Sequence, residues 1–284
     1  MIGKRFTGGV EVPGGEYTML AGIGIAVAAL VGGFVLEHGS IGDLGSLSSA
    51  LIVIGGTLGA VALGTPDSAV VSAFRRCRGM FKRNVVATRT EADLIVRFAV
   101  MMRRAGTAAI EPDVEAMPPG FLRRALMLVL DGVSPQEVRH QLQNDIGAEE
   151  EIAEADARVF EQAGGYAPTI GIIGAVLGLI QVMKKLGNVD AVGQGIAAAF
   201  ISTLYGVALA NLLLLPVAAR IRLGAQADRQ SRQLLLEGVT AIAEGLSLQV
   251  VRSRLGILRS AGSGTPQAPV TPTVFGQYGA RKSA

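Results

Sequence analysis

The stretch GGYAPTIGIIGAVLGLIQVM, residues 164–183, decides the fold. Its last 17 residues contain no Asp, Glu, Lys, Arg or His. A helix needs about 20 mainly apolar residues to cross a bilayer, and about 17 mark the short end of the range. Gly174 and Gly178 lie four residues apart, as do Gly55 and Gly59 in an earlier apolar stretch, and this spacing lets helix backbones approach closely. The stretch therefore predicts a membrane span packed against a neighbouring helix.

Three more stretches share this character: residues 19–36, 47–63 and 196–219. The chain of 284 residues is 50% hydrophobic with a mean hydropathy of +0.44, which is high for a soluble domain. A second span follows the first after a short link, so the first is interpreted as an uncleaved anchor and not a signal sequence. The prediction is an all-α integral membrane protein with four transmembrane helices, a helical cytoplasmic domain between helices 2 and 3, and a C-terminal cytoplasmic helix.

The flanking Lys and Arg residues indicate the orientation. The link between the first two spans carries none, whereas basic residues follow the second and fourth spans. Both termini and the long middle segment are therefore expected in the cytoplasm, although Lys184 and Lys185 fall on the predicted outer side. The basic residues that follow the second span are interpreted as a membrane-side anchor: Arg75, Arg76, Arg78, Lys82 and Arg83.

The predicted organisation has six parts. They are a cytoplasmic N-terminus (1–18), a transmembrane hairpin (19–64), a cytoplasmic helical domain (65–165), a second hairpin (166–219), a cytoplasmic amphipathic helix (220–259) and a disordered tail (260–284) rich in Gly, Ser, Pro and Thr. Helix starts are predicted at Thr90 and at Ser134, where Pro and Glu follow in the first turn. Gly164 and Gly165 are a potential helix break, and Pro168 is expected to open the third span.

The spans lack any ionisable residue, although ion pathways normally carry one at membrane depth. The chain is therefore either a structural membrane protein or half of a conduction site whose carboxylate comes from a partner. One cysteine, Cys77, excludes an internal disulfide, and two histidines give no metal cluster. We expect no cofactor or bound metal. The sequence also contains no catalytic constellation, and a net charge of +3 gives no argument for nucleic acid.

Polar uncharged side chains concentrate in the third and fourth spans. The first two spans have few, with Thr57 the main one. Isolated hydroxyls commonly join helices, each pair contributing about 1 kcal/mol or less. Their uneven distribution predicts that the last two spans line something polar while the first two face lipid. The polar residues are Thr169, Gln181, Ser202, Thr203, Tyr205 and Asn211.

These stretches resemble the MotA/PomA family of flagellar motor stator subunits, within the MotA/TolQ/ExbB superfamily. IVIGGTLGA (52–60) looks like the family's second span, residues 164–183 like its third, and AAFISTLYGVALANLLLLPVA (198–218) like its fourth. LLEGVTAIAEG (235–245) resembles the helix that follows. The resemblance covers about residues 22–258, and the third and fourth spans are its specific part.

The resemblance implies a homopentamer in the bacterial inner membrane around two copies of a single-span MotB/PomB-like subunit that carries the conducting Asp. Ion flow would turn the ring, and its cytoplasmic charges would push on the rotor protein FliG. Arg103 and Glu111 match the rotor contacts, and Arg104 lies beside Arg103 in the sequence. The positions that match or adjoin the ion pathway, facing the partner, are Pro168, Thr169, Ala175, Ser202, Thr203, Tyr205 and Pro216.

The coupling ion is expected to be H+, with Na+ as the alternative. Sodium-type relatives carry Thr where this chain has Ala175, and a hard cation needs several oxygen ligands. Two other functions remain open. One is an ExbB/TolQ-like proton-channel subunit, which has a single span before its cytoplasmic segment. The other is a non-conducting membrane scaffold with four spans.

Overall fold

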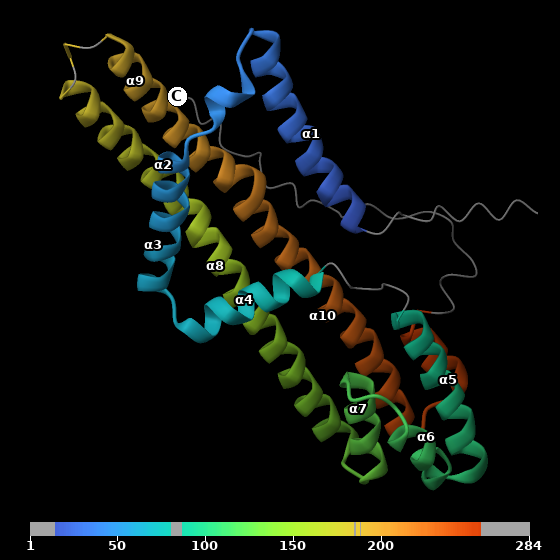
Figure 1. The fold of residues 1–284 in the computed structure, drawn as a ribbon. Coiled ribbons are helices and arrows are strands. Elements are labelled where there is room, and N and C mark those ends of the chain that lie inside the picture. The colour runs from blue at the N-terminus through green and yellow to red at the C-terminus, as the bar shows by residue number, and fades with distance from the viewer. Residues whose placement is uncertain (1–14, 81–86, 185, 188, 257–284) are drawn as a thin grey trace, which may run out of the picture.

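The computed structural model describes residues 15–80, 87–184, 186–187 and 189–256, and all regular structure within these ranges is helical. Two long rods run side by side through the molecule, one formed by α8 and the other by α9 continued by α10 (Figure 1). The remaining helices pack around this pair. The helices and helical turns are α1 (Gly15–Leu36), η1 (Ile41–Leu44), α2 (Leu47–Ala50), η2 (Leu51–Gly55), α3 (Gly56–Gly64), α4 (Asp67–Met80), α5 (Ala87–Ala105), η3 (Thr107–Ile110), α6 (Glu111–Glu115), α7 (Phe121–Leu130), α8 (Pro135–Met183), α9 (Val189–Ala208), η4 (Leu209–Leu214), α10 (Leu215–Ala243) and α11 (Leu248–Arg254).

Helix α8 runs for 49 residues without interruption. The predicted start is confirmed, because the Ser134 hydroxyl accepts a hydrogen bond from the Glu137 amide at 3.3 Å. Two predictions are wrong. The Gly164–Gly165 pair does not break the helix, and Pro168 lies inside it instead of opening it. The helix continues because its neighbours hold it: a Cβ on Gly164 would meet Leu215 at 2.8 Å, so glycine here allows close packing.

The second rod changes its winding within the fourth span. Helix α9 passes into a π-helical turn, η4, before α10 resumes the ordinary winding at Leu215. The rod stops at Ala243, and Gly245 takes a positive φ of +67° just beyond the end. Helix α11 then folds back onto α10. The single helix expected after the fourth span is therefore two helices, because glycine at this position supports a left-handed turn.

Glycines form the contact between α8 and α9. A Cβ on Gly206 would lie 2.5 Å from the Ala167 carbonyl oxygen, and one on Gly178 would lie 3.1 Å from the Ala199 side chain. The close packing predicted from Gly174 and Gly178 is confirmed. The same prediction is wrong for Gly55 and Gly59, because a Cβ added at either position would meet nothing within 4 Å.

One side of the second span packs against α8. Val53, Thr57 and Val61 are buried, and η2 and α3 contact α8. Leu58 on the same span is 54% exposed, so the prediction that the first two spans form an outer layer stays a prediction. Helix α1 also exposes large apolar side chains, and Leu36 is 84% exposed.

A separate apolar core joins α5, α6, α7 and α11 to the lower parts of α8 and α10. Ile95, Phe98 and Leu126 are among its buried members. The helix start predicted at Thr90 is wrong, because α5 already begins at Ala87.

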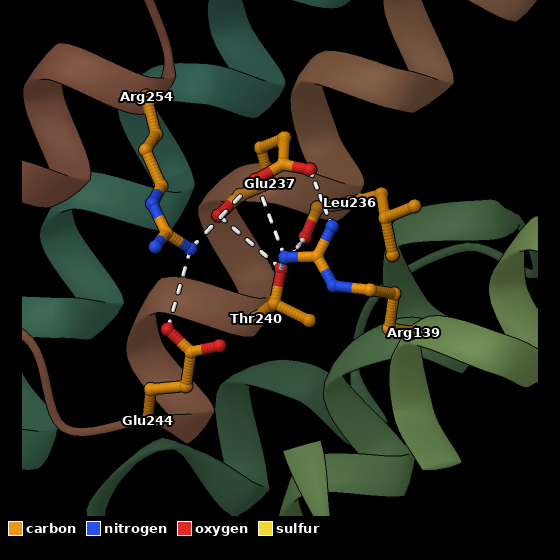
Figure 2. A network of polar contacts seen from close by, with 6 residues as sticks. All are labelled: Arg139, Leu236, Glu237, Thr240, Glu244 and Arg254. Carbon is orange, nitrogen blue, oxygen red and sulfur yellow. Dashed lines mark hydrogen bonds and ion pairs between the residues drawn. The ribbon is translucent and has the colours of Figure 1, made fainter. Parts of the chain in front are cut away.

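A polar network holds this core to the long helices (Figure 2). Arg139 of α8 donates to both carboxylate oxygens of Glu237 on α10 and to the Thr240 hydroxyl at 3.3 Å. Arg254 of α11 lies 3.7 Å from Glu237 and 3.3 Å from Glu244. One carboxylate, Glu237, thus links three helices.

Candidate functional site

The second span covers one side of the α8–α9 pair. A Cβ on Gly56 would meet Ile170 of α8 at 2.8 Å, and one on Gly174 would meet Ile52 at 3.3 Å. Near the other end of the span, the Ser49 hydroxyl donates to the Ala198 carbonyl of α9 at 3.2 Å. These contacts identify which side of each long helix is covered.

Three of the predicted pathway residues lie toward the opposite side. Residues of a helix follow one another at about 100°, so Ala175 and Pro168 lie on the flank of α8 away from Ile170. Thr203 lies on the flank of α9 away from Ala198 by the same reasoning. All three are partly buried. The structure thus places Pro168, Ala175 and Thr203 along one uncovered side of the α8–α9 pair.

The other predicted pathway residues lie elsewhere. Ser202 is buried between α8 and α9, within van der Waals reach of Gly174. The Tyr205 hydroxyl donates to the Leu44 carbonyl and accepts from the Ser46 amide at 3.3 Å. These hydrogen bonds join α9 to the link between the first two spans. Thr169 is exposed on the far face of α8, and its hydroxyl bonds to its own helix at the Tyr166 carbonyl, 2.8 Å away.

The two prolines lie at one level of the molecule. Pro168 has no amide hydrogen for the carbonyl of Gly164, four residues earlier. Leu215, the residue directly before Pro216, packs against Gly164. Pro216 itself follows the π-helical turn at the start of α10. The two places where the long helices depart from regular hydrogen bonding therefore face each other.

The predicted rotor contacts lie at the opposite end from α9 (Figure 1). Arg103 and Arg104 occupy the last turn of α5, Glu111 begins α6, and all three are exposed. Gly106 between them has φ +82° and ψ 176°, a conformation available essentially to glycine alone. This residue sets how the basic end of α5 is positioned relative to the acidic start of α6.

An ion-pair ladder between α8 and α10 was not predicted. Arg222 binds both Glu154 at 2.9 Å and Glu161 at 2.7 Å, and Arg229 binds Glu150 at 2.8 Å. The hydrogen bonds from Arg222 lower the pKa of Glu154 and Glu161. A signal existed in the sequence, because Glu154 and Glu161 lie seven residues apart, as do Arg222 and Arg229. Residues at that spacing share one helix face.

The part of the chain described by the structure contains no group of three or more His, Cys, Asp or Glu placed to hold a metal ion. Within that same part, three helices are long and apolar enough to cross a membrane, and they include Leu47–Gly64, α8 and Val192–Ala243. A shorter apolar helix covers Ala21–Leu36.

Comparison with known proteins gives consistent matches. The family model described as the MotA/TolQ/ExbB proton channel family matches residues 114–234, and that of the Motility protein A N-terminal region matches residues 20–109. Motility protein A of Bacillus subtilis is 34% identical over 84% of this chain and 89% of its own length. The solved MotAB structure of C. jejuni superposes with a TM-score of 0.80 at 27% identity, over 89% of this chain and 99% of that one.

A second solved structure, the flagellar MotAB stator complex of Bacillus subtilis, has a TM-score of 0.77 at 31% identity, over 85% of this chain and 98% of its own. Sequence and fold thus agree over most of the chain. The chain belongs to the MotA/PomA family of flagellar motor stator subunits, within the MotA/TolQ/ExbB proton channel superfamily.

Proposed function

We propose that this chain forms, with a MotB-like partner, an ion channel that couples proton flow to torque on the flagellar rotor. The observation that carries the proposal is the uncovered side of the α8–α9 pair, where Pro168, Ala175 and Thr203 lie together. Large apolar side chains such as Ile172 and Val207 are 56% and 44% exposed beside them in the single chain. A partner helix and neighbouring copies would cover this surface.

The conducting carboxylate comes from the partner in this proposal. All four spans lack an ionisable residue, whereas ion pathways in membranes normally contain one. The solved relatives are MotAB complexes, which supports a MotB-like subunit as the source. Thr203 then supplies a hydroxyl beside that carboxylate, and Ala175 supplies no oxygen, which favours H+ over Na+.

The proposed arrangement is a homopentamer in the inner membrane, with four spans and both termini in the cytoplasm. Helix α1 contains residues 19–36, which supply the first span. The core around Phe98 and Leu126 then lies in the cytoplasm, and its exposed Arg103 and Glu111 contact the rotor protein FliG. Charged side chains at such a surface orient an encounter more than they add affinity.

Motility assays test the proposal with a matched pair of hydroxyl removals. Thr203→Val should abolish swimming and ion flux in cells that depend on this chain, because it removes the hydroxyl on the uncovered side. Thr169→Val makes the same chemical change on the far face of α8 and should retain most motility. Equal swimming of both variants would favour the non-conducting scaffold. Swimming speed measured while sodium and pH are varied separately then identifies the ion.

A further inference from the structure

Helix α4 follows the second span directly and crosses both long helices just beyond it (Figure 1). The Thr65 hydroxyl, in the turn between α3 and α4, donates to the Gln162 side chain of α8 at 3.1 Å. Ala73 is fully buried against a cluster that includes Phe160 and Ile221. The turn and the buried face hold α4 at the level where the chain leaves the second span.

Two contacts determine how α4 is rolled about its axis. The Phe74 ring lies 5.8 Å from the Phe160 ring, whereas Arg76 forms an ion pair with Asp156, which is 1% exposed. Phe160 is four residues closer to the membrane end of α8 than Asp156, about 6 Å along the axis. Phe74 therefore lies on the membrane side of α4, and Arg76 lies on the cytoplasmic side.

The outer surface of α4 combines apolar and basic side chains. Phe74, Arg78, Val71 and Arg75 follow one another around the helix at about 100° to 200° from the buried Ala73. Phe74 and Val71 are each 55% exposed, and both arginines are exposed. A helix lying in a membrane interface has this composition, with bulky apolar groups toward the acyl chains and basic groups beside the headgroups.

We propose that α4 lies in the cytoplasmic leaflet, with Val71 and Phe74 at the upper acyl chains and Arg75 and Arg78 on the phosphates of anionic lipids. The proposal rests on the proposed membrane topology. The occupant is lipid because α4 is continuous with a membrane span and its apolar side faces that span. The ion pair between Arg76 and the buried Asp156 joins α4 in this position to α8.

Tryptophan fluorescence tests this placement, because the chain contains no tryptophan. Full-length Phe74→Trp protein in lipid nanodiscs should emit at short wavelength and be quenched by lipids brominated near the start of the acyl chain. Gly79→Trp is the matched control. It lies on the same helix about 140° from Phe74, its position is exposed, and an added Cβ would meet nothing within 4 Å. Its indole should be quenched several-fold less.

A third variant separates the two proposals. Leu58→Trp places an indole in the second span, at a side chain that is 54% exposed. The placement of α4 would be wrong, and the topology intact, if Leu58→Trp is strongly quenched while Phe74→Trp is quenched no more than Gly79→Trp. The same conclusion would follow if neither α4 variant is quenched. Loss of quenching at Leu58→Trp as well would overturn the topology and this inference together.

Lipid charge tests the role of the arginines. In Phe74→Trp protein, brominated anionic lipid should quench more than the same fraction of brominated zwitterionic lipid. Adding Arg75→Gln and Arg78→Gln should lower this preference by about fivefold for each arginine removed. Arg103→Gln with Arg104→Gln removes the same charge from the α5 end and should leave the preference unchanged. A preference that survives the α4 pair, or falls equally with the α5 pair, would refute headgroup binding by α4.

Discussion

A methyl group at Gly206 should separate the two central membrane helices. The Cβ of Gly206→Ala would lie 2.5 Å from the Ala167 carbonyl oxygen and 3.1 Å from the Gly171 Cα. Both neighbours are backbone atoms, so no side-chain rotation relieves the contact. The helices must move apart by about 0.5–1 Å, and overpacking of this kind costs about 2–3 kcal/mol.

Gly193→Ala is the control that isolates this packing cost. It makes the same substitution in the same helix, where an added Cβ would meet nothing within 4 Å. The gain in helix propensity from Gly to Ala, about 1 kcal/mol, is common to both variants and cancels in their difference. The difference in unfolding free energy between the variants is therefore the packing cost alone.

Thermal unfolding of the full chain in detergent micelles, followed by circular dichroism, measures the effect. Gly206→Ala should melt about 5–10 °C below Gly193→Ala, since 1 kcal/mol shifts the Tm of a chain of this size by about 2–4 °C. Equal melting temperatures for the two variants would refute the close approach of α8 and α9 at Gly206.

Two further predictions concern the helical part around the apolar core of α5, α6, α7 and α11. Hydrogen bonding from Arg139 lowers the pKa of Glu237, so this carboxylate contributes stability above the ordinary carboxylate pKa, and the contribution is lost as pH falls through the lowered value. When the free energy of unfolding is measured as the pH is lowered, it should fall less in Glu237→Gln than in the unsubstituted chain. An equal fall in both would contradict the role given to Glu237. Gly106→Ala should cost about 1–3 kcal/mol and reduce swimming speed, because its φ of +82° disfavours any side chain. Gly147→Ala, in a right-handed helix with nothing within 4 Å of the added Cβ, should do neither.

Much of the membrane architecture is local in origin and was predictable. The second span was predicted at residues 47–63, and an apolar helix long enough to cross a membrane covers Leu47–Gly64, because its apolar length is set by the sequence alone. The Ser134 start was also predictable, since its hydrogen bond involves residues three apart.

Features that depend on distant contacts were not predictable. Gly164 and Gly165 signal a break locally, but packing of Leu215 against Gly164 keeps α8 continuous. Tyr205 was expected to face a partner, and its bonds to the link residues Leu44 and Ser46 span about 160 positions of sequence. No local pattern distinguishes these arrangements from the alternatives.

The unbroken course of α8 has a mechanical consequence. At 1.5 Å per residue, the helix is about 74 Å long, and Pro168 divides it into arms of about 50 Å and 23 Å. Pro168 is the position where the helix lacks a backbone hydrogen bond and bends most easily. A bend of about 10° there displaces the distant end of the long arm by about 9 Å, about twice the displacement of about 4 Å at the end of the short arm. Small motions within the bilayer would thus be geometrically amplified at the surface that carries Arg103 and Glu111.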